Sequence, residues 1–392
     1  MKNLILITIM LSIILTGCSS EKPYTETELN GVKIVENTKA GIEPDFNVNF
    51  KHLYTIQNSE NDTSFVLNFP GDRNDLNSDI DSKLNLYVVD NKRSKILKFD
   101  KNGKFVNDWG RKGQGPGEFP WNPVDIFVSE KDTTVYVYDG SGRLSLFDLE
   151  GNFKKFFNIQ GKNMRASNFF MTDNGPLFIG ETYEGQWGTD EFKMGKCLYN
   201  ATPEFGIKDK IYGHLEPFDM KQIDADDQGL MTAINDRSIY IAGGTKTEYE
   251  IFRFDYSGKK ISEIKKKYAP LRRSKEELAE IKEALEKFTQ KMNGQIQFKE
   301  VSTLRSVITQ MFLDHSNNLW VSVNESMFNE EGQQFDIFNN EGHFLKTVSV
   351  PELTGLKVRS KGKYIIAATP IEENYSEDGK ADVVIKVFEL NL

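Results

Sequence analysis

The sequence predicts an all-β protein, a six-bladed β-propeller with one α-helical insertion. Three observations favour this fold class: a strand-rich unit recurs along the chain, the strands within the unit are short, and one long interval between units has the pattern of a helix. A unit of about 40 to 50 residues cannot bury its own two faces, so neighbouring units must pack on each other. Units of this kind are typical of propeller blades.

The repeat is clearest in two segments that align with each other. The first, "LNLYVVDNKRSKILKFDKNGKFVNDWG", starts at Leu84, and the second, "TTVYVYDGSGRLSLFDLEGNFKKFFNI", starts at Thr133. Each has a Tyr-Val strand that ends in Asp, a turn with an Arg, a strand that ends in Phe-Asp, and a hairpin turn with a Gly. The third strand then begins with Phe. This order of strands and turns indicates an antiparallel meander.

Weaker copies extend the repeat to six. The first strands of the six cores start near residues 86, 135, 177, 239, 319 and 364. The strand-like segment 52–69 is expected to complete the first or the last blade, which is how such rings are closed. Two β-sandwiches are the alternative fold, but the repetition of the same strand–turn–strand text favours the propeller.

The helical insertion is predicted at about 270–294. Ser274 with Glu277 three residues later forms a capping box, and apolar residues then recur at spacings of three and four. Asn293-Gly294 is a suitable stop for the helix. A helix does not fit within a blade, so we expect it to lie against the propeller with its apolar stripe packed on a blade face. A role as a lid or a partner-binding element is the alternative.

The N-terminus predicts export and a lipid anchor. Lys2 precedes the apolar stretch from Leu4 to Leu15, which is too short for a membrane span of about 20 residues and suits a secretory signal. The text "LTGC", which ends at Cys18, resembles the bacterial lipoprotein signal. This resemblance implies cleavage before Cys18 and acylation of that cysteine. An ordinary signal peptide with a chance cysteine is the alternative.

These features divide the chain into three parts. They are a lipoprotein signal peptide (1–17), a flexible N-terminal tether (18–45) and the propeller (46–392). Several acyl chains on Cys18 would hold the protein stably on a membrane. We therefore expect a protein of the cell envelope that is lipid-anchored to the outer membrane and faces the periplasm or the cell surface.

The composition is that of a globular protein and excludes some partners. Charged residues make up 27% and aromatic residues 12%, and the 28 Phe and 14 Tyr favour β-structure. The formal net charge of -9 argues against a general nucleic-acid partner, which needs a basic field. Two cysteines are too few for a disulfide framework, and Cys197 is expected to be a buried thiol rather than a nucleophile.

No pattern in the sequence predicts catalysis, a metal site or a cofactor. The Gly-rich stretch "GRKGQGPGEFPWNP" (110–123) lacks the Lys-Ser/Thr of a phosphate-binding P-loop and precedes a strand-like segment. The four histidines form no metal-binding pair, and no Gly-x-Ser-x-Gly elbow occurs. The oxygen-rich segments 224–229 and 314–318 are interpreted as hairpin or Asx turns rather than Ca²⁺ sites. We expect no cofactor and no metal.

The Gly-rich stretch and the text after it carry a resemblance to a known family. "GRKGQGPGEFPWNPVDIFVSEKDTTVYVYDGSGRLSLFD" resembles one NHL-type propeller repeat. The matching positions are Gly115, Pro116, Gly117, Phe119, Pro123, Tyr136, Val137, Asp139, Arg143, Phe147 and Asp148. With the lipoprotein signal and the helical insertion, the chain resembles the six-bladed β-propeller lipoproteins of Bacteroidetes-type bacteria. The resemblance implies an extracytoplasmic binding or accessory protein, although some NHL-like propellers are hydrolases or lyases.

Candidate ligand contacts lie in the loops, because propellers bind ligands at one rim and at the mouth of the channel. The polar candidates are Arg111, Lys112, Gln114 and Arg305, and the aromatic candidates are Trp121, Tyr183 and Trp187. The expected ligand is a glycan, a peptide or an envelope protein, bound without catalysis. A propeller hydrolase or lyase with a site at the central channel is the alternative. The stretch 110–123 is interpreted as a crossover between two blades, with Phe119 plugged between them.

Overall fold

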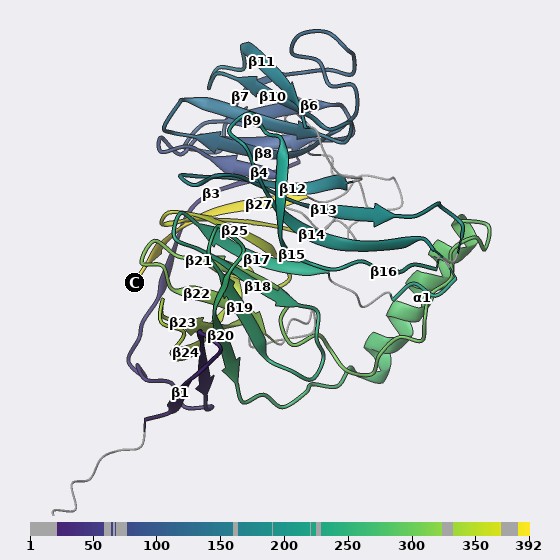
Figure 1. The fold of residues 1–392 in the computed structure, drawn as a ribbon. Coiled ribbons are helices and arrows are strands. Elements are labelled where there is room, and N and C mark those ends of the chain that lie inside the picture. The colour runs from purple at the N-terminus through teal and green to yellow at the C-terminus, as the bar shows by residue number, and fades with distance from the viewer. Residues whose placement is uncertain are drawn as a thin grey trace, which may run out of the picture.

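The computed structural model describes residues 22–58, 64–65, 67, 77–159, 164–189, 191–219, 221–224, 229–323, 332–369 and 383–392. The predicted signal peptide and the predicted lipidation site Cys18 lie outside these residues, and so do residues 225–228 of one oxygen-rich segment. The described chain forms six sheets, each with a meander of antiparallel strands, and one α-helix, the arrangement of a six-bladed β-propeller (Figure 1). The predicted fold class is confirmed.

Each blade is a meander of four strands, counted outward from the centre of the ring. Blade 1 contains β4 (Ser78–Ile80), β5 (Leu86–Asp90), β6 (Lys95–Phe99) and β7 (Phe105–Trp109), and blade 2 contains β8 (Pro123–Ser129), β9 (Thr134–Asp139), β10 (Arg143–Phe147) and β11 (Phe153–Asn158). Blade 3 contains β12 (Met164–Thr172), β13 (Gly175–Glu184), β14 (Lys193–Ala201) and β15 (Ile207–Tyr212), with the short β16 (Glu216–Pro217) paired to β14.

Blades 4 to 6 repeat the plan. Blade 4 contains β17 (Leu230–Asn235), β18 (Ser238–Gly243), β19 (Glu250–Phe254) and β20 (Lys260–Lys266), and blade 5 contains β21 (Gln310–Leu313), β22 (Leu319–Val323), β23 (Gln333–Phe338) and β24 (Phe344–Val350). A 3₁₀ turn, η1 (Pro351–Leu353), leads to blade 6, which contains β25 (Lys357–Lys361), β26 (Tyr364–Ala368), β27 (Val384–Asn391) and β3 (Asn49–Gln57).

Six clusters of buried apolar side chains hold the blades together. One cluster lies at each junction of neighbouring blades, including the junction of blade 6 with blade 1. Successive side chains of a strand point to opposite faces, so a strand inside the ring is buried on both sides. In β5, Leu86 and Val88 pack toward blade 6, whereas Tyr87 and Val89 pack toward blade 2. The junctions form a closed series, which requires a ring.

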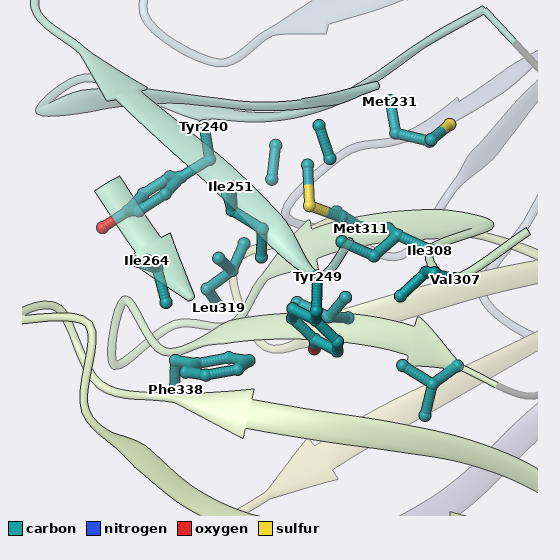
Figure 2. Close-up of a cluster of buried hydrophobic side chains, with 14 of the residues drawn as sticks. Met231, Tyr240, Tyr249, Ile251, Ile264, Val307, Ile308, Met311, Leu319 and Phe338 are labelled. Atoms are coloured by element: carbon teal, nitrogen blue, oxygen red, sulfur yellow. The ribbon is translucent and has the colours of Figure 1, made fainter. Parts of the chain in front are cut away.

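The junction of blades 4 and 5 illustrates this packing. Figure 2 shows Tyr240 and Ile251 of blade 4 beside Leu319 and Phe338 of blade 5, and all four side chains are buried. Burial of apolar surface against the next blade supplies the driving force that a single blade lacks.

The ring is closed by strands from the two ends of the chain. The N-terminal strand β3 pairs antiparallel with the C-terminal strand β27, and Ile56 lies opposite Ile385. Of the segment 52–69, which the sequence predicts to complete the first or the last blade, residues 52–57 complete the last one. Most of residues 58–69 lie outside the described residues.

The segment that the sequence predicts to be a flexible tether contains an ordered hairpin, so this prediction is wrong for residues 24–37. Strands β1 (Tyr24–Leu29) and β2 (Val32–Asn37) pair with each other, and β2 pairs in parallel with β20 at the outer edge of blade 4. Val35 of β2 is fully buried. The open edge of β20 offers unpaired backbone groups, and the hairpin covers them.

The helix α1 (Lys275–Lys291) begins and ends where the sequence predicts. Ser274 is its N-cap and accepts a hydrogen bond from the Glu277 backbone N–H, at 3.1 Å. The apolar stripe, however, does not pack on a blade face: no residue of α1 is buried, and Phe288 is 42% exposed. The ring of Phe288 instead meets that of Phe298, in the chain just after the helix, with centroids 5.9 Å apart. In Figure 1 the helix lies at the right-hand edge of the molecule. Among the described helices, none is long and apolar enough to span a membrane.

Candidate ligand-binding rim

The meander sorts all connections onto two rims of the ring. Strands of a blade run alternately up and down, so the first-to-second and third-to-fourth strand turns share one rim. We call it the short-turn rim, because its connections have at most five residues, as at 100–104 and 148–152. The second-to-third strand loops and the crossovers between blades share the other rim, which we call the long-loop rim. In Figure 1 it faces right, where α1 and the far ends of β13 and β14 lie.

On the short-turn rim, one turn between the third and fourth strands recurs in blades 1, 2, 4 and 5. In the turn 148–152, the Asp148 carboxylate accepts hydrogen bonds from the Glu150 and Asn152 backbone N–H groups, at 3.0 and 2.8 Å. Asp100, Asp255 and Asn339 hold the corresponding turns of blades 1, 4 and 5 in the same way. Burial raises the pKa of Asp148, but hydrogen bonds from the Asn152 side chain and from the backbone N–H groups of the turn together outweigh it and hold the pKa below its usual value. The side-chain oxygens that begin these four turns are therefore occupied by their own backbone.

All seven candidate ligand residues lie on the long-loop rim. Arg111, Lys112, Gln114 and Trp121 belong to the crossover between blades 1 and 2, Tyr183 and Trp187 to the extended β13–β14 hairpin, and Arg305 to the crossover between blades 4 and 5. The structure thus brings them to one side of the ring but divides them among three places. The surroundings of their side chains also differ: some already have partners within the protein, whereas others are exposed to solvent.

The Gly-rich crossover is folded around Glu118. Its carboxylate accepts hydrogen bonds from the Gly115 backbone N–H (2.8 Å) and from the Arg111 guanidinium (2.7 Å). These two bonds hold the pKa of Glu118 below its usual value, and the backbone bond contributes most. Arg111 is therefore engaged within the loop, and the backbone carbonyl of Gln114 accepts a hydrogen bond from the Arg143 guanidinium. The loop is a preformed structure.

The base of this crossover is core, as predicted. Phe119 is fully buried in the junction of blades 1 and 2, with its ring 6.0 Å from that of Phe147. Its neighbour in sequence at position 121 has the opposite environment: the Trp121 side chain is 59% exposed. The crossover therefore anchors itself with one aromatic ring and presents another to solvent.

Lys112 and Trp121 form a pair on the surface of the rim. The Lys112 ammonium lies 5.9 Å from the centre of the Trp121 ring, within the range of a cation–π contact, and donates a long hydrogen bond (3.5 Å) to Asn122. No carboxylate of the described residues forms an ion pair with Lys112. Lys112 thus differs from Arg111, because its charge is available beside an exposed flat ring.

The second aromatic place is the tip of blade 3. Trp187 is 60% exposed, yet its ring packs edge-on against Phe192 at 4.8 Å, and Phe192 is buried. The ring of Tyr183 stacks on that of Phe192, and Phe218, next to β16, contacts both Trp187 and Phe192. Because β16 pairs with the extension of β14, the hairpin projects as an ordered three-stranded arm. Sequence reasoning did not identify Phe192 and Phe218 as supports for Trp187.

Arg305 has a structural partner. Its guanidinium pairs with the Glu277 carboxylate at 2.8 Å, and both side chains are largely buried. Arg273 approaches the same carboxylate at 3.5 Å. The three residues fasten the first turn of α1 to the two antiparallel segments that carry it, so Arg305 serves the insertion itself.

The inner strands carry a charged cluster that sequence reasoning missed. Asp79 of β4 and Asp125 of β8 are buried, and each carboxylate accepts a backbone N–H from the inner strand of the next blade, Val128 or Phe169. Two cations of β25 in blade 6 reach the same carboxylates. Lys361 pairs with Asp79 at 2.9 Å, and Arg359 pairs with Asp125 at 3.1 Å. This cluster clasps blade 6 to blades 1 and 2.

A signal for the clasp was present in the sequence. Asp79 lies in "SDI" and Asp125 in "VDI", at matching positions of two repeats. An acidic residue in an otherwise apolar inner strand needs partners, and here the next blade supplies a backbone N–H and blade 6 supplies a cation.

In the described part of the chain, no group of three or more His, Cys, Asp or Glu side chains could hold a metal ion. The Asp314 carboxylate in the segment 314–318 accepts hydrogen bonds from Ser316, Asn318 and Trp320, so it forms the predicted Asx turn. Cys197 is fully buried, as predicted.

Comparison with a family model agrees with the fold. The model, described as a six-bladed β-propeller, DUF5128, matches residues 78–225. An exported protein of Bacteroides fragilis is similar in structure with a TM-score of 0.49 and 14% identity, over 92% of this chain and 99% of that one. A DUF4221 family member from Bacteroides vulgatus also has a TM-score of 0.49 and 14% identity, over 88% and 98%. No curated protein matches this chain.

Proposed function

We propose that the protein is a lipid-anchored, non-catalytic binding module of the cell envelope, and that it binds a glycan on its long-loop rim. The observation that carries the proposal is that the side chains of Trp121 and Trp187 are exposed and yet held in place. Both indole rings are more than half exposed, and each is held by ordered neighbours. An exposed aromatic ring with a fixed orientation loses little conformational entropy when a ligand stacks on it.

The rim chemistry supports a sugar with an acidic group. A sugar ring offers an apolar C–H face to an indole, and its polar rim takes hydrogen bonds. Beside Trp121, the Lys112 ammonium has no carboxylate partner among the described residues and lies where an anionic substituent would pass. A peptide or an envelope protein is a different outcome of the same test, and no arrangement in the described residues favours a hydrolase or lyase.

The binding test uses the soluble chain from residue 19 onward on arrays of acidic and neutral glycans and of peptides. For a glycan that binds, we expect Trp121→Ala and Trp187→Ala each to weaken the affinity by about 1–3 kcal/mol in calorimetry, the range for one aromatic anchor. Phe156→Ala is the matched control, because Phe156 is also an exposed aromatic residue but lies on the outer strand β11. Binding only to peptides, or equal loss in all three variants, would contradict the proposal.

The charge of Lys112 and the lipid anchor at Cys18 are tested by separate experiments. Lys112→Met should weaken acidic glycans and leave neutral ones unchanged, which a salt titration checks independently. Cys18→Ala should abolish lipid labelling and move the protein from the membrane fraction to the soluble fraction. An unchanged partition of this variant would contradict the anchor and leave the glycan proposal standing.

A further inference from the structure

The N-terminal hairpin is fastened to the outer edge of blades 4 and 5. Strand β2 pairs with β20 over residues 33–37, and the buried Asn37 side chain makes three hydrogen bonds. It donates to the carbonyls of Lys265 (3.1 Å) and Gly342 (3.0 Å) and accepts from the Phe344 backbone N–H (2.8 Å). The Gly342 and Phe344 bonds tie the hairpin to the β23–β24 turn of blade 5.

The first strand of the hairpin is held at the same turn. The ring of Tyr24 stacks on that of His343, with centroids 3.9 Å apart, and the Glu26 carboxylate lies 2.6 Å from His343 Nε2. Lys33 pairs with Glu26 at 2.7 Å. The chain is therefore fixed to the propeller from Tyr24 onward, well before the first strand of the ring itself.

This early attachment shortens the connection to the proposed anchor. Tyr24 is six residues after Cys18, and a chain of six residues spans at most about 20 Å. If the chain were first attached at Asn49, where β3 begins, the connection would span up to about 110 Å, and the propeller could tumble above the membrane. A span of about 20 Å leaves the hairpin at the bilayer surface.

We infer that the protein stands on the membrane with the outer edge of blades 4 and 5 toward the lipid surface. Blades 1 and 2 are opposite blades 4 and 5 in a ring of six, so they are held farthest from the bilayer. In Figure 1, β1 lies at the lower end of the molecule and β7, β10 and β11 of blades 1 and 2 at the upper end. This orientation rests on the anchor at Cys18 in the proposed function, and it presents Trp121 away from the membrane.

Two equivalent turns allow a matched test. Glu341 lies in the β23–β24 turn of blade 5, and Asn102 in the β6–β7 turn of blade 1. Both are exposed, and the backbone N–H of each donates to the first side chain of its turn, at 3.0 Å to Asn339 and 2.9 Å to Asp100. Each is replaced by cysteine, Glu341→Cys or Asn102→Cys, in the full lipidated chain. The native Cys197 is buried and does not compete for a thiol-reactive fluorophore.

The labelled proteins are bound to phosphatidylcholine vesicles that contain a lipid with a nitroxide on its headgroup. We expect a larger loss of emission at position 341 than at position 102. A flexible linker of about 25 Gly and Ser residues, inserted between Glu21 and Lys22, adds a span of roughly 28 Å and should make the two losses equal. This insertion leaves every contact of the hairpin intact.

The outcomes separate the orientation from the anchor. Equal losses at the two positions in the membrane-bound chain, or a difference that the linker does not reduce, would overturn the orientation alone. If the chain with Cys18 does not bind the vesicles, or if Cys18→Ala binds equally well, the anchor is wrong and the orientation falls with it. Glycan binding by the soluble chain is unaffected by either result.

Discussion

The short-turn rim and the long-loop rim are made by the same strands, yet they differ in almost every respect. On the short-turn rim, one Asx turn recurs in four of the blades, and its first side chain bonds to the backbone of the turn. On the long-loop rim, the connections range from the short turn 140–142 to the long crossover 267–309, and the two most exposed indole rings of the chain's described part lie there.

This difference has a physical cause. A third-to-fourth strand turn must fit against the neighbouring blade, so its shape is fixed by packing: Gly151 lies at φ +92°, where a Cβ would come within 2.5 Å of the Trp109 ring. On the long-loop rim, Trp121 of the crossover 110–122 and Trp187 of the β13–β14 hairpin are exposed to solvent, and the length of such a loop can vary at little cost in free energy. The turns of the short-turn rim are therefore a signature of the fold, whereas ligand binding is expected on the long-loop rim.

The largest expected effect comes from a core residue of the long-loop rim. It tests whether all residues of this rim are dispensable for stability. Phe119→Ala should lower the free energy of unfolding by about 3–5 kcal/mol, because it empties a site in the core between blades 1 and 2. Trp121→Ala, two residues along the same crossover, should change it by less than about 0.5 kcal/mol. Urea unfolding followed by circular dichroism measures both. Similar losses in the two variants would mean that exposure does not divide this loop into core and contact residues.

The second prediction compares one glycine from each rim. Gly151→Ala on the short-turn rim should cost about 2–5 kcal/mol, from the strained backbone and the clash with Trp109. Gly188→Ala on the long-loop rim should cost only about 1–2 kcal/mol, because its backbone strain is similar and its clash is absent. Gly188 has a φ of +81°, and a Cβ added there would meet no heavy atom within 4 Å. Thermal unfolding ranks the variants, and a smaller loss for Gly151→Ala would contradict the packing explanation.

The third prediction concerns the attachment of α1 to the long-loop rim. Arg305→Ala removes the partner of Glu277 and should weaken the attachment by about 1–3 kcal/mol, as expected for a partly buried charged hydrogen bond. Hydrogen exchange in residues 275–291 should become faster, while the blades stay protected. Lys287→Ala is the control, because its pair with Glu283 is exposed, at 72% and 66%, and should contribute almost nothing. Faster exchange across all blades would show that the helix is part of the ring core.

The smallest effect is a local pH dependence of the Gly-rich crossover. The pKa of Glu118 is lower in the folded loop than its ordinary value of 4.5, because the Gly115 N–H and Arg111 favour the carboxylate. The ionised group therefore stabilises the loop fully above pH 4.5, and this contribution is lost as the pH falls through the lowered pKa. Protection of residues 111–118 from hydrogen exchange should fall only below pH 4.5, and Glu118→Gln should abolish that dependence. Loss of protection near pH 6 would assign it to another group.

Much of the fold could be predicted because its determinants are local. The recurring strand–turn–strand pattern predicts where the blades lie in the chain, and the capping box at Ser274 predicts the start of α1. The docked hairpin was missed, although Asn30-Gly31 between two alternating segments is a hairpin signal, with both residues at positive φ. Its docking on β20 joins residues more than 200 positions apart, and no local pattern encodes such a pairing.

For the candidate ligand residues, too, the sequence determines one part and the tertiary structure another. The sequence alone selected loop residues with suitable chemistry, and all seven lie on one rim because a meander alternates its turns. Only the tertiary structure decided which of these side chains already have partners: Arg111 forms an ion pair with Glu118, and Arg305 forms one with Glu277. Ion pairs between distant segments depend on the packing of the blades, which composition and spacing do not specify.

By itself, the sequence determined that this chain is a ring of repeated blades, with a helix inserted where the repeat is interrupted. These properties follow from periodicity and turn chemistry, which act over a few residues. The tertiary structure decided the clasp of Asp79 and Asp125 by blade 6, the exposure of Trp121 beside the buried Phe119, and the fastening of β1 and β2 to blades 4 and 5. Each of these depends on surfaces that come together only when the ring closes.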